Sequence, residues 1–382
     1  MDPKKILIVA GEPSGDLHAS NLVKDLKRLN PHLKFFGLGG SLSKKAGVDI
    51  IFDISGLALI GAVEVLKNIF VVKRAYNAVI SKVDSLKPDF AILVDYPGFN
   101  LRLAMELKKR SIPVIYYISP QVWAWGRDRI DIIRKAVKKI LVFFKFEEEL
   151  YKKYDINVEF VGHPVLDIVK LSLTKEDVLK KYNLSGEKIT ISLLPGSRAI
   201  EVKRLLPVMV FAGKIINEKL NKTQFIIVKH SDLSINLYER IIENSGLEIR
   251  LAEDDAYNVL SASDFAIVAS GTATLESAAI GTPLVIIYKV NLLTFILYKL
   301  VSNIQFLGLI NIIAQKEVAP ELLQSNATPE KIANKAIEIL SDENKILSMR
   351  RELKSVRDSL GSSGASLRAA RSILNILEGI DK

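Results

Sequence analysis

The chain has 382 residues, of which 49% are hydrophobic, and it carries 53 lysines and arginines against 43 aspartates and glutamates. This length exceeds one ordinary core of roughly 100–200 residues, so we expect two domains. The formal net charge of +10 favours an anionic partner, while the absence of cysteine excludes disulfides, thiolate zinc sites and a cysteine nucleophile.

In the amino-terminal half, short apolar runs alternate with amphipathic stretches. Four runs have the length and composition of buried parallel strands, namely residues 6–10, 90–94, 114–118 and 140–144. Helical patterns lie between them at 17–29 and 101–110. The first run is too short for a signal-peptide core, so we expect a cytoplasmic protein.

The same alternation returns in the second half. Its expected strands and helices are residues 190–194, 202–220, 225–228, 237–245, 265–269, 274–280 and 284–288. The stretch 162–188 contains Pro164 and the turn Ser185-Gly186, and it separates the halves. The fold class is therefore α/β, with two Rossmann-like doubly wound domains, residues 1–168 and 186–346, that face a cleft. Ligands of such sheets bind beyond the carboxyl ends of the strands.

The first expected strand is followed by the turn GEPSGD at 11–16. Its glycines permit close backbone approach, and the next helix offers free N–H groups to an anionic or oxygen-rich ligand. The spacing is not G-x-G-x-x-G, which disfavours a dinucleotide site. An ordinary turn with Ser14 or Asp16 as helix cap explains the pattern equally well.

The motif VDYPGFN at 94–100 places Asp95 at the end of an expected central strand. Partial desolvation there can raise its pKa from about 3.9 and make it a base for a hydroxyl group. A helix cap is the competing role. Because Asn100 can supply that cap, the pattern favours a functional Asp95.

Both tryptophans of the chain lie in SPQVWAW at 119–125. Aromatic side chains after a strand can pack against a sugar or an acyl chain. Spacing alone favours partly buried packing for Trp123 and Trp125.

Two loops of the second half have features of phosphate sites. LPGSR at 194–198 follows a strand, and its amides, hydroxyl and guanidinium can bind phosphate oxygens. SGTATLE at 270–276 follows another strand and opens a helix, where Glu276 can accept hydrogen bonds from a ribose diol. A capped helix would explain either loop alone, whereas the pair favours a nucleotide.

Together these motifs resemble the lipid-A-disaccharide synthase family. The resemblance runs almost end to end and includes FVGHP at 160–164 and VAPELL at 318–323. It implies an inverting glycosyltransferase of the two-domain GT-B fold. Such an enzyme joins UDP-2,3-diacylglucosamine to 2,3-diacylglucosamine 1-phosphate (lipid X), releasing UDP and a β-1,6-linked precursor of lipid A in Gram-negative bacteria.

The resemblance also implies roles for individual residues. Asp95 is the expected base. The acceptor side would be lined by Glu12, Ser14 and Asp16. The UDP-linked donor would contact Ser197, Arg198, Ser270, Gly271, Thr272, Glu276, Asn311 and Gln315. We expect no metal and no other cofactor, because Arg198 and a helix N-terminus can balance the diphosphate charge. Gly98 departs from relatives that carry aspartate there, which leaves Asp95 as the only carboxylate of its loop.

Partners follow from the same resemblance. We expect lipid-linked sugar substrates and no nucleic acid. The apolar stretch 57–72 is an ordinary core helix or, as lipid substrates favour, an interfacial surface, with contacts from Leu57, Leu59, Ile60, Val63 and Leu66. The basic excess favours peripheral association with the anionic cytoplasmic face of the inner membrane. Polar residues interrupt the apolar stretch 292–313, so we expect no membrane span there. The helices expected over 347–382 would pack back on the first domain, and the family allows a homodimer.

Two other functions fit the same residues. A sugar-nucleotide epimerase or hydrolase of this fold would act on a soluble UDP-sugar. A non-catalytic nucleotide- or lipid-binding module would need no base at Asp95.

Overall fold

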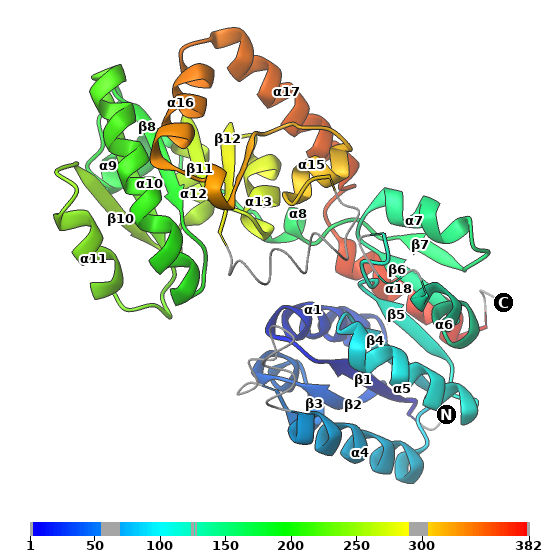
Figure 1. Cartoon of the computed structure of the whole chain (residues 1–382). Helices are drawn as coiled ribbons and strands as arrows, with labels where there is room; N and C mark the ends of the chain where they lie inside the picture. Colours follow the sequence, from blue (N-terminus) through cyan, green and yellow to red (C-terminus); the bar gives the residue numbers. More distant parts are fainter. Residues whose placement is uncertain (1–2, 55–68, 124–125, 127, 290–304, 380–382) are drawn as a thin grey trace. The chain divides into compact units, whose positions relative to one another are not determined.

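The computed structural model describes residues 3–54, 69–123, 126, 128–289 and 305–379 (Figure 1). The chain divides into two compact units, Met1–Pro164 with Leu360–Lys382, and Val165–Ser359. Each unit is built on one parallel sheet with helices packed on it, which confirms the predicted α/β class with two Rossmann-like domains.

The first unit has a seven-stranded sheet within the described residues. Its strands, in their order across the sheet, are β3 (Val48–Asp53), β2 (Lys34–Gly39), β1 (Lys5–Ala10), β4 (Phe90–Val94), β5 (Val114–Tyr117), β6 (Lys139–Val142) and β7 (Val158–Phe160). Its helices are α1 (Pro13–Leu29), α2 (Ser41–Lys45), α4 (Ile69–Leu86), α5 (Pro97–Lys109), α6 (Arg129–Ala136), α7 (Lys145–Lys152) and α18 (Ala365–Leu377).

Both faces of this sheet are buried, which explains why its central strands are continuous apolar runs. Leu7 and Val9 of β1 face a core shared with α4, α5 and α6. Ile6 and Ile8 point the other way, into a core shared with α1 and α18. Full burial of each such side chain contributes roughly 1.5–3 kcal/mol relative to exposure. Successive side chains of one strand thus pack alternately against the helices on the two faces of the sheet.

The second unit has a six-stranded parallel sheet within the described residues. Its strands, in their order across the sheet, are β10 (Ile249–Glu253), β9 (Thr223–Lys229), β8 (Ile189–Leu194), β11 (Phe265–Ala269), β12 (Leu284–Tyr288) and β13 (Glu321–Leu323). Its helices are α8 (Val165–Ile168), α9 (Lys175–Lys181), α10 (Ala199–Leu220), α11 (Asn236–Glu243), α12 (Ala256–Ala262), α13 (Thr272–Ile280), α15 (Leu309–Ala314), the 3-10 helix η1 (Gln324–Asn326), α16 (Pro329–Leu340) and α17 (Glu343–Ser359).

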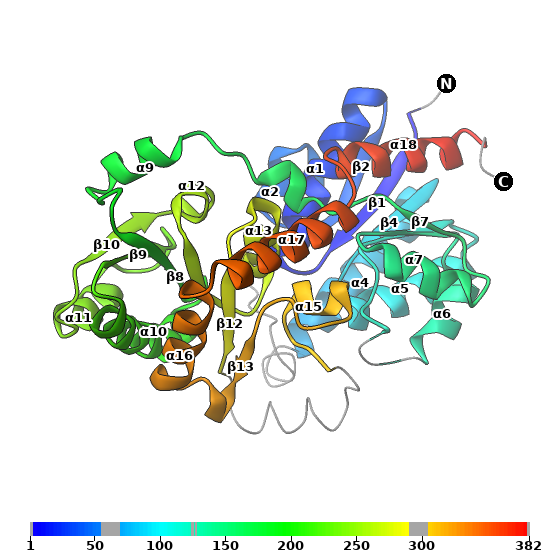
Figure 2. The same cartoon turned by 90° about the horizontal axis from the view of Figure 1, so that it is seen from above.

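The carboxyl-terminal helices divide between the units, which corrects the prediction that 347–382 packs as a whole on the first domain. Helix α17 belongs to the second unit, where it packs on α13, α15 and α16 and buries Leu353 and Val356. Helix α18 returns to the first unit and lies beside α1 (Figure 2), where Ala369 and Ile373 are fully buried. The apolar face of α17 is therefore already covered before the chain leaves the second unit at Ser359.

The second unit also begins earlier than residue 186. Residues after Val165 pack on it, because Asn258 of α12 accepts hydrogen bonds from the backbone N–H groups of Ser172 and Leu173 at 3.0 and 3.2 Å. Lys181 of α9 forms an ion pair with Asp255 at 2.7 Å. The predicted linker is thus largely an ordered part of the second unit.

In the described part of the chain, no helix is both long and apolar enough to cross a membrane. The predicted interfacial contacts Leu57, Leu59, Ile60, Val63 and Leu66 lie outside the described residues, as does most of the stretch 292–313.

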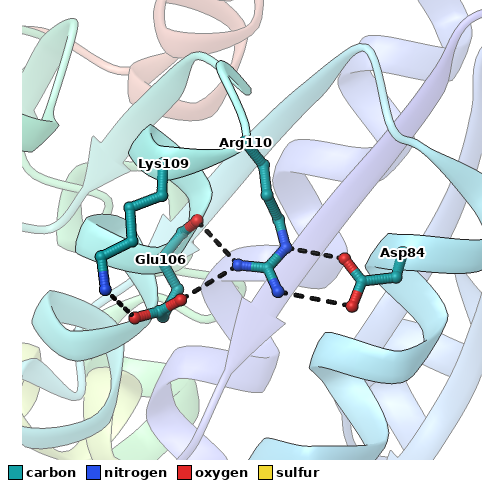
Figure 3. A network of polar contacts seen from close by, with 4 residues as sticks. All are labelled: Asp84, Glu106, Lys109 and Arg110. Atoms are coloured by element: carbon teal, nitrogen blue, oxygen red, sulfur yellow. Dashed lines mark hydrogen bonds and ion pairs between the residues drawn. The ribbon is translucent and has the colours of Figure 1, made fainter.

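An exposed ion-pair network joins α4 to the carboxyl end of α5, the helix that begins next to Asp95 (Figure 3). Arg110 donates through Nε and Nη2 to the two carboxylate oxygens of Asp84, at 2.7 and 3.3 Å. Its Nη1 donates to Glu106 at 3.0 Å, and Lys109 donates to the same carboxylate at 2.6 Å. Water screens these charges, so the network contributes to orientation more than to stability.

Asp16 is a structural carboxylate in the first turn of α1. It is only 4% exposed, and its oxygens accept hydrogen bonds from the backbone N–H groups of Gly40, Leu42 and Ser43 at 2.8, 3.0 and 3.1 Å. These are free donors at the start of α2, which no other described group satisfies. Asp16 therefore caps α2, and its contact with an acceptor stays a prediction.

Replacement of Asp16 by alanine should lower the free energy of unfolding by about 3 kcal/mol, because three backbone donors lose a charged acceptor. Urea denaturation followed by circular dichroism measures this loss. The matched control is Ser14→Ala in the same turn, where the side chain is exposed and little change is expected. Equal stability of the two variants would contradict the capping role.

Glu147, in the first turn of α7, is a second buried carboxylate. It is 4% exposed and accepts hydrogen bonds from Ser119 Oγ at 2.8 Å and Trp123 Nε1 at 3.3 Å. It thereby holds the SPQVWAW loop on α7. Burial raises the pKa of Glu147 to about 7, although its hydrogen-bond donors act in the opposite direction.

This raised pKa predicts a pH-dependent stability. The folded state keeps Glu147 protonated above the pKa of the unfolded chain, so its contribution is present below about pH 4.5 and is lost as the pH rises through about 7. A shift of this size corresponds to the order of 3 kcal/mol. Urea denaturation at pH 5 and pH 8 should show a larger loss of stability for the wild type than for Glu147→Gln. Parallel pH profiles of the two proteins would refute the assignment.

Candidate active site

A cavity of about 510 Å³ lies at the carboxyl ends of three neighbouring strands of the second unit. It is lined by Leu194 at the end of β8, by Val228 and Lys229 at the end of β9, and by Ala269 at the end of β11. The loops after β8 and β11, which the sequence marked as phosphate sites, both contribute to its lining. Parallel pairing brings them together although about 75 residues separate them in the chain.

The loop between β8 and α10 presents Ser197 and Arg198 to the cavity. Gly196 has a φ of +106°, and a Cβ there would lie 2.4 Å from Glu201 Oε2, so the turn requires glycine. The Arg198 side chain is 55% exposed and its Nη1 lies 3.2 Å from Glu201 Oε1. This exposed pair leaves the guanidinium free to exchange its partner for an anionic ligand.

The loop between β11 and α13 presents Ser270, Gly271 and Thr272. Gly271 has a φ of +150° and is the N-cap of α13. The first turn of α13 therefore directs free N–H groups at the cavity, where they favour a negative charge.

Glu276 lies one turn into α13 and lines the same cavity. Tyr257 Oη donates a hydrogen bond to its Oε1 at 3.4 Å. Burial raises the pKa of Glu276, and the bond from Tyr257 partly offsets this rise. A carboxylate in this position can accept hydrogen bonds from a diol.

The polar lining residues that were not assigned to a site from the sequence are Glu201, Lys229, His230, Asp254 and Tyr257. Lys229 is 5% exposed and forms an ion pair with Glu253 at 2.6 Å. Lys229 and His230 come directly after the expected strand 225–228. Because ligands bind beyond the carboxyl ends of strands, the sequence could have identified them. Asp254 follows β10, which the apolar pattern does not reveal.

Asn311 and Gln315 do not line this cavity, so their contact with the donor stays a prediction. The Asn311 side chain is fully buried and bonded, donating to Ala319 O and Glu321 Oε1 at 2.7 and 2.8 Å and accepting from the N–H groups of Val318 and Ala319 at 2.7 and 3.0 Å. It clamps the segment before β13. Gln315 is an exposed residue that ends α15.

In the first unit, Asp95 follows β4 in an unusual backbone conformation. Asp95 and the next residue, Tyr96, have φ values of +48° and +47°. Two successive left-handed residues other than glycine cost about 1–3 kcal/mol each, and such costs recur at functional sites. Hydrogen bonds hold the turn, because Asp95 O accepts from Asn100 Nδ2 at 2.7 Å and from Tyr116 Oη at 2.6 Å.

The Asp95 carboxyl is partly buried. Burial raises its pKa, and a hydrogen bond from the Tyr96 N–H acts in the opposite direction. The sequence-based expectation of a desolvated carboxylate at this strand end is therefore met. A raised pKa makes a carboxylate a stronger base for a hydroxyl proton.

The GEPSGD loop touches the Asp95 loop. A Cβ on Gly11 would lie 2.0 Å from Tyr96 Cδ1, so the Tyr96 ring packs on a position that only glycine can occupy. Glu12 is half-buried at the N-cap of α1, and Ser14 is exposed in its first turn. Gly98 has open space around its Cβ position, so sterics do not explain why this chain lacks an aspartate there.

Among the described residues, no group of three or more histidine and acidic side chains is arranged to hold a metal ion. Independence of metal remains a prediction.

Comparison with known proteins adds an independent line of argument. The family model described as lipid-A-disaccharide synthetase matches residues 6–373. A lipid-A-disaccharide synthase of Syntrophus aciditrophicus (strain SB) is 41% identical over 382 residues, which cover 100% of both chains. One of Coxiella burnetii (strain CbuG_Q212) is 40% identical over 378 residues, which cover 99% of this chain and 100% of the relative.

Solved structures share the fold at low identity. The calicheamicin glycosyltransferase CalG4 has a TM-score of 0.64 and 12% identity, with 100% of both chains covered. S. aureus MnaA, solved with UDP, has a TM-score of 0.64 and 14% identity, with 99% of this chain and 98% of that chain covered. These similarities are consistent with the two-domain GT-B fold, whereas the match to residues 6–373 and the relatives about 40% identical along the whole chain identify its sequence family. The chain belongs to the lipid-A-disaccharide synthase family.

Proposed function

We propose that the protein transfers a 2,3-diacylglucosamine unit from UDP to the 6-hydroxyl of 2,3-diacylglucosamine 1-phosphate, giving the β-1,6-linked disaccharide 1-phosphate and UDP. Membership of the family along nearly the whole chain is the observation that carries this proposal. The cavity of the second unit supports it, because it combines a helix N-terminus, Arg198 and Glu276. Those groups suit a diphosphate and a ribose.

The proposed reaction is a single displacement with inversion. Asp95 takes the proton of the acceptor hydroxyl while that oxygen forms a bond to the anomeric carbon, and the bond from that carbon to the UDP oxygen breaks. The leaving diphosphate gains negative charge. Ser197, Arg198 and the first turn of α13 stabilise this charge, so the proposed chemistry requires no metal. Glu12 and Ser14 remain candidates for the acceptor side.

The rival functions are weaker on specific grounds. The epimerase structures that share the fold are only 10–14% identical to this chain, whereas two lipid-A-disaccharide synthases are 41% and 40% identical to it. A non-catalytic module would give no reason for a strained, partly buried carboxylate at the end of β4.

Asp95→Asn should lower the rate of disaccharide formation by about 100-fold or more, because general-base catalysis contributes roughly 10²–10⁴-fold. Incubation with both lipid substrates and mass spectrometry of the products measures the rate. Release of UDP from the donor alone would instead favour a hydrolase or epimerase. Full transfer by Asp95→Asn would exclude the proposed mechanism.

Binding of UDP, measured by calorimetry, provides the control for that experiment. Asp95→Asn should retain the affinity of the wild type, since its side chain lies in the other unit from the cavity. Arg198→Ala and Glu276→Ala should weaken UDP binding by roughly tenfold each, because each loses a hydrogen bond that involves a charged group. If both variants bound UDP with the affinity of the wild type, the nucleotide site would have to lie elsewhere.

We further propose peripheral association with an anionic membrane surface. In the described residues of α4 that belong to the apolar stretch 57–72, Ile69 and Phe70 are 50% and 78% exposed. Lys73 and Arg74 are exposed in the next turn. Apolar side chains beside basic ones are the combination that binds anionic bilayers.

Flotation with phosphatidylglycerol-containing vesicles should recover more protein than flotation with neutral vesicles. Phe70→Ser should weaken vesicle binding roughly tenfold, since burial of an aromatic side chain is worth about 1.5–3 kcal/mol. The matched control is Phe211→Ser in α10, where the ring is 57% exposed and no effect is expected. Equal binding to both kinds of vesicle would disprove the electrostatic component.

A further inference from the structure

We propose that Asn100 and Tyr116 are positioning residues that hold the Asp95 turn in its left-handed conformation and so aim the Asp95 carboxylate at the acceptor hydroxyl. This inference rests on the proposed role of Asp95 as base. Neither side chain is expected to touch substrate, because both are fully buried.

The contacts converge on one carbonyl. Asp95 O accepts from Asn100 Nδ2 at 2.7 Å and from Tyr116 Oη at 2.6 Å. Those two donors come from different elements, the first turn of α5 and the middle of β5. The peptide that links Asp95 to Tyr96 is thereby fixed from two sides, and its orientation determines where the Asp95 side chain leaves the backbone.

Asn100 also joins neighbouring strands. The same amide nitrogen lies 3.1 Å from Val94 O at the end of β4 and 3.5 Å from Val9 O near the end of β1. Three carbonyl oxygens around one amide atom identify that atom as the nitrogen. The ends of two central strands and the Asp95 turn therefore share one donor group.

Stability alone does not explain this arrangement. Asn100 Oδ1 is buried without a hydrogen-bond partner among the described residues. A buried unpaired acceptor is unfavourable, and two successive residues with φ near +47° are unfavourable as well. One cost falls on Asn100 and the other on Asp95 and Tyr96, so both lie in the turn that carries the proposed base, which is the pattern of a turn maintained for function.

Tyr116→Phe tests the inference because it removes only the hydroxyl that holds Asp95 O. We expect kcat to fall roughly 10- to 100-fold, since a small misplacement of a catalytic group has effects of this size. The KM for the UDP-linked donor should stay within about twofold of the wild type, because the donor cavity lies in the other unit. In the plot of kcat against pH, the acidic limb should move to lower pH, because the Asp95 carboxylate, once its turn is no longer held, regains contact with water.

Tyr151→Phe is the matched control. Tyr151 is also fully buried in the first unit, and its hydroxyl donates to Pro120 O at 3.2 Å and not to the Asp95 carbonyl. It loses the same chemical group and a hydrogen bond of the same kind. We expect kcat within about twofold of the wild type and an unmoved acid limb.

A second comparison separates positioning from a general structural effect. In an Asp95→Asn background the carboxylate is already lost, so adding Tyr116→Phe should lower the residual rate by less than about twofold. Asn100→Ala should resemble Tyr116→Phe if it folds. A kcat for Tyr116→Phe equal to that of Tyr151→Phe, or the same 10- to 100-fold loss in both backgrounds, would overturn the inference. Full activity of Asp95→Asn itself would instead overturn the proposed function.

Discussion

Parallel strand pairing is the constraint on which the rest of this structure depends. Every strand pair formed by the described residues is parallel, so each connection between paired strands must cross back over the sheet, and the carboxyl ends share one edge. Helices cover both faces of each sheet and bury the central strands away from water. The loops at that edge are therefore the part of each sheet where backbone N–H groups and carboxylates can meet a ligand while a rigid core holds them.

Buried polar groups in these loops fall into two kinds, distinguished by how fully they are hydrogen bonded. Asp16, Glu147 and Asn311 each have several short contacts with protein donors or acceptors, and each ties a loop to its neighbour. Such groups have little capacity left for a substrate. Asp95 and Glu276 have fewer hydrogen-bond partners, and burial raises the pKa of both carboxyls. A partly buried carboxylate that lacks a full set of hydrogen-bond partners is suited to chemistry or ligand binding.

The two units contribute different chemistry to the proposed reaction. The second unit offers a cavity in which cationic and helix N-terminal groups suit a diphosphate, while the first offers a carboxylate whose orientation is held by hydrogen bonds. Electrostatic stabilisation of a leaving group and removal of a proton are separate requirements. Because the groups that meet these two requirements belong to different units, each is positioned by its own sheet. No single loop has to meet both requirements.

The amino-acid sequence determined the central strands, because strands buried on both faces must be continuous apolar runs, and β1, β4, β8 and β11 lie where those runs predict them. It did not reveal the edge strands β3, β7, β10 and β13, whose partial exposure breaks the apolar pattern, nor the interior strand β2, whose apolar run is interrupted by Gly37. It located Asp95, Arg198 and Glu276 by their places after strands. Only the tertiary structure decided that Asp16 and Asn311 are clamps, that Lys229 and Tyr257 line the cavity, and that α17 and α18 belong to different units. Those distinctions depend on contacts between residues far apart in the chain, which local pattern does not encode.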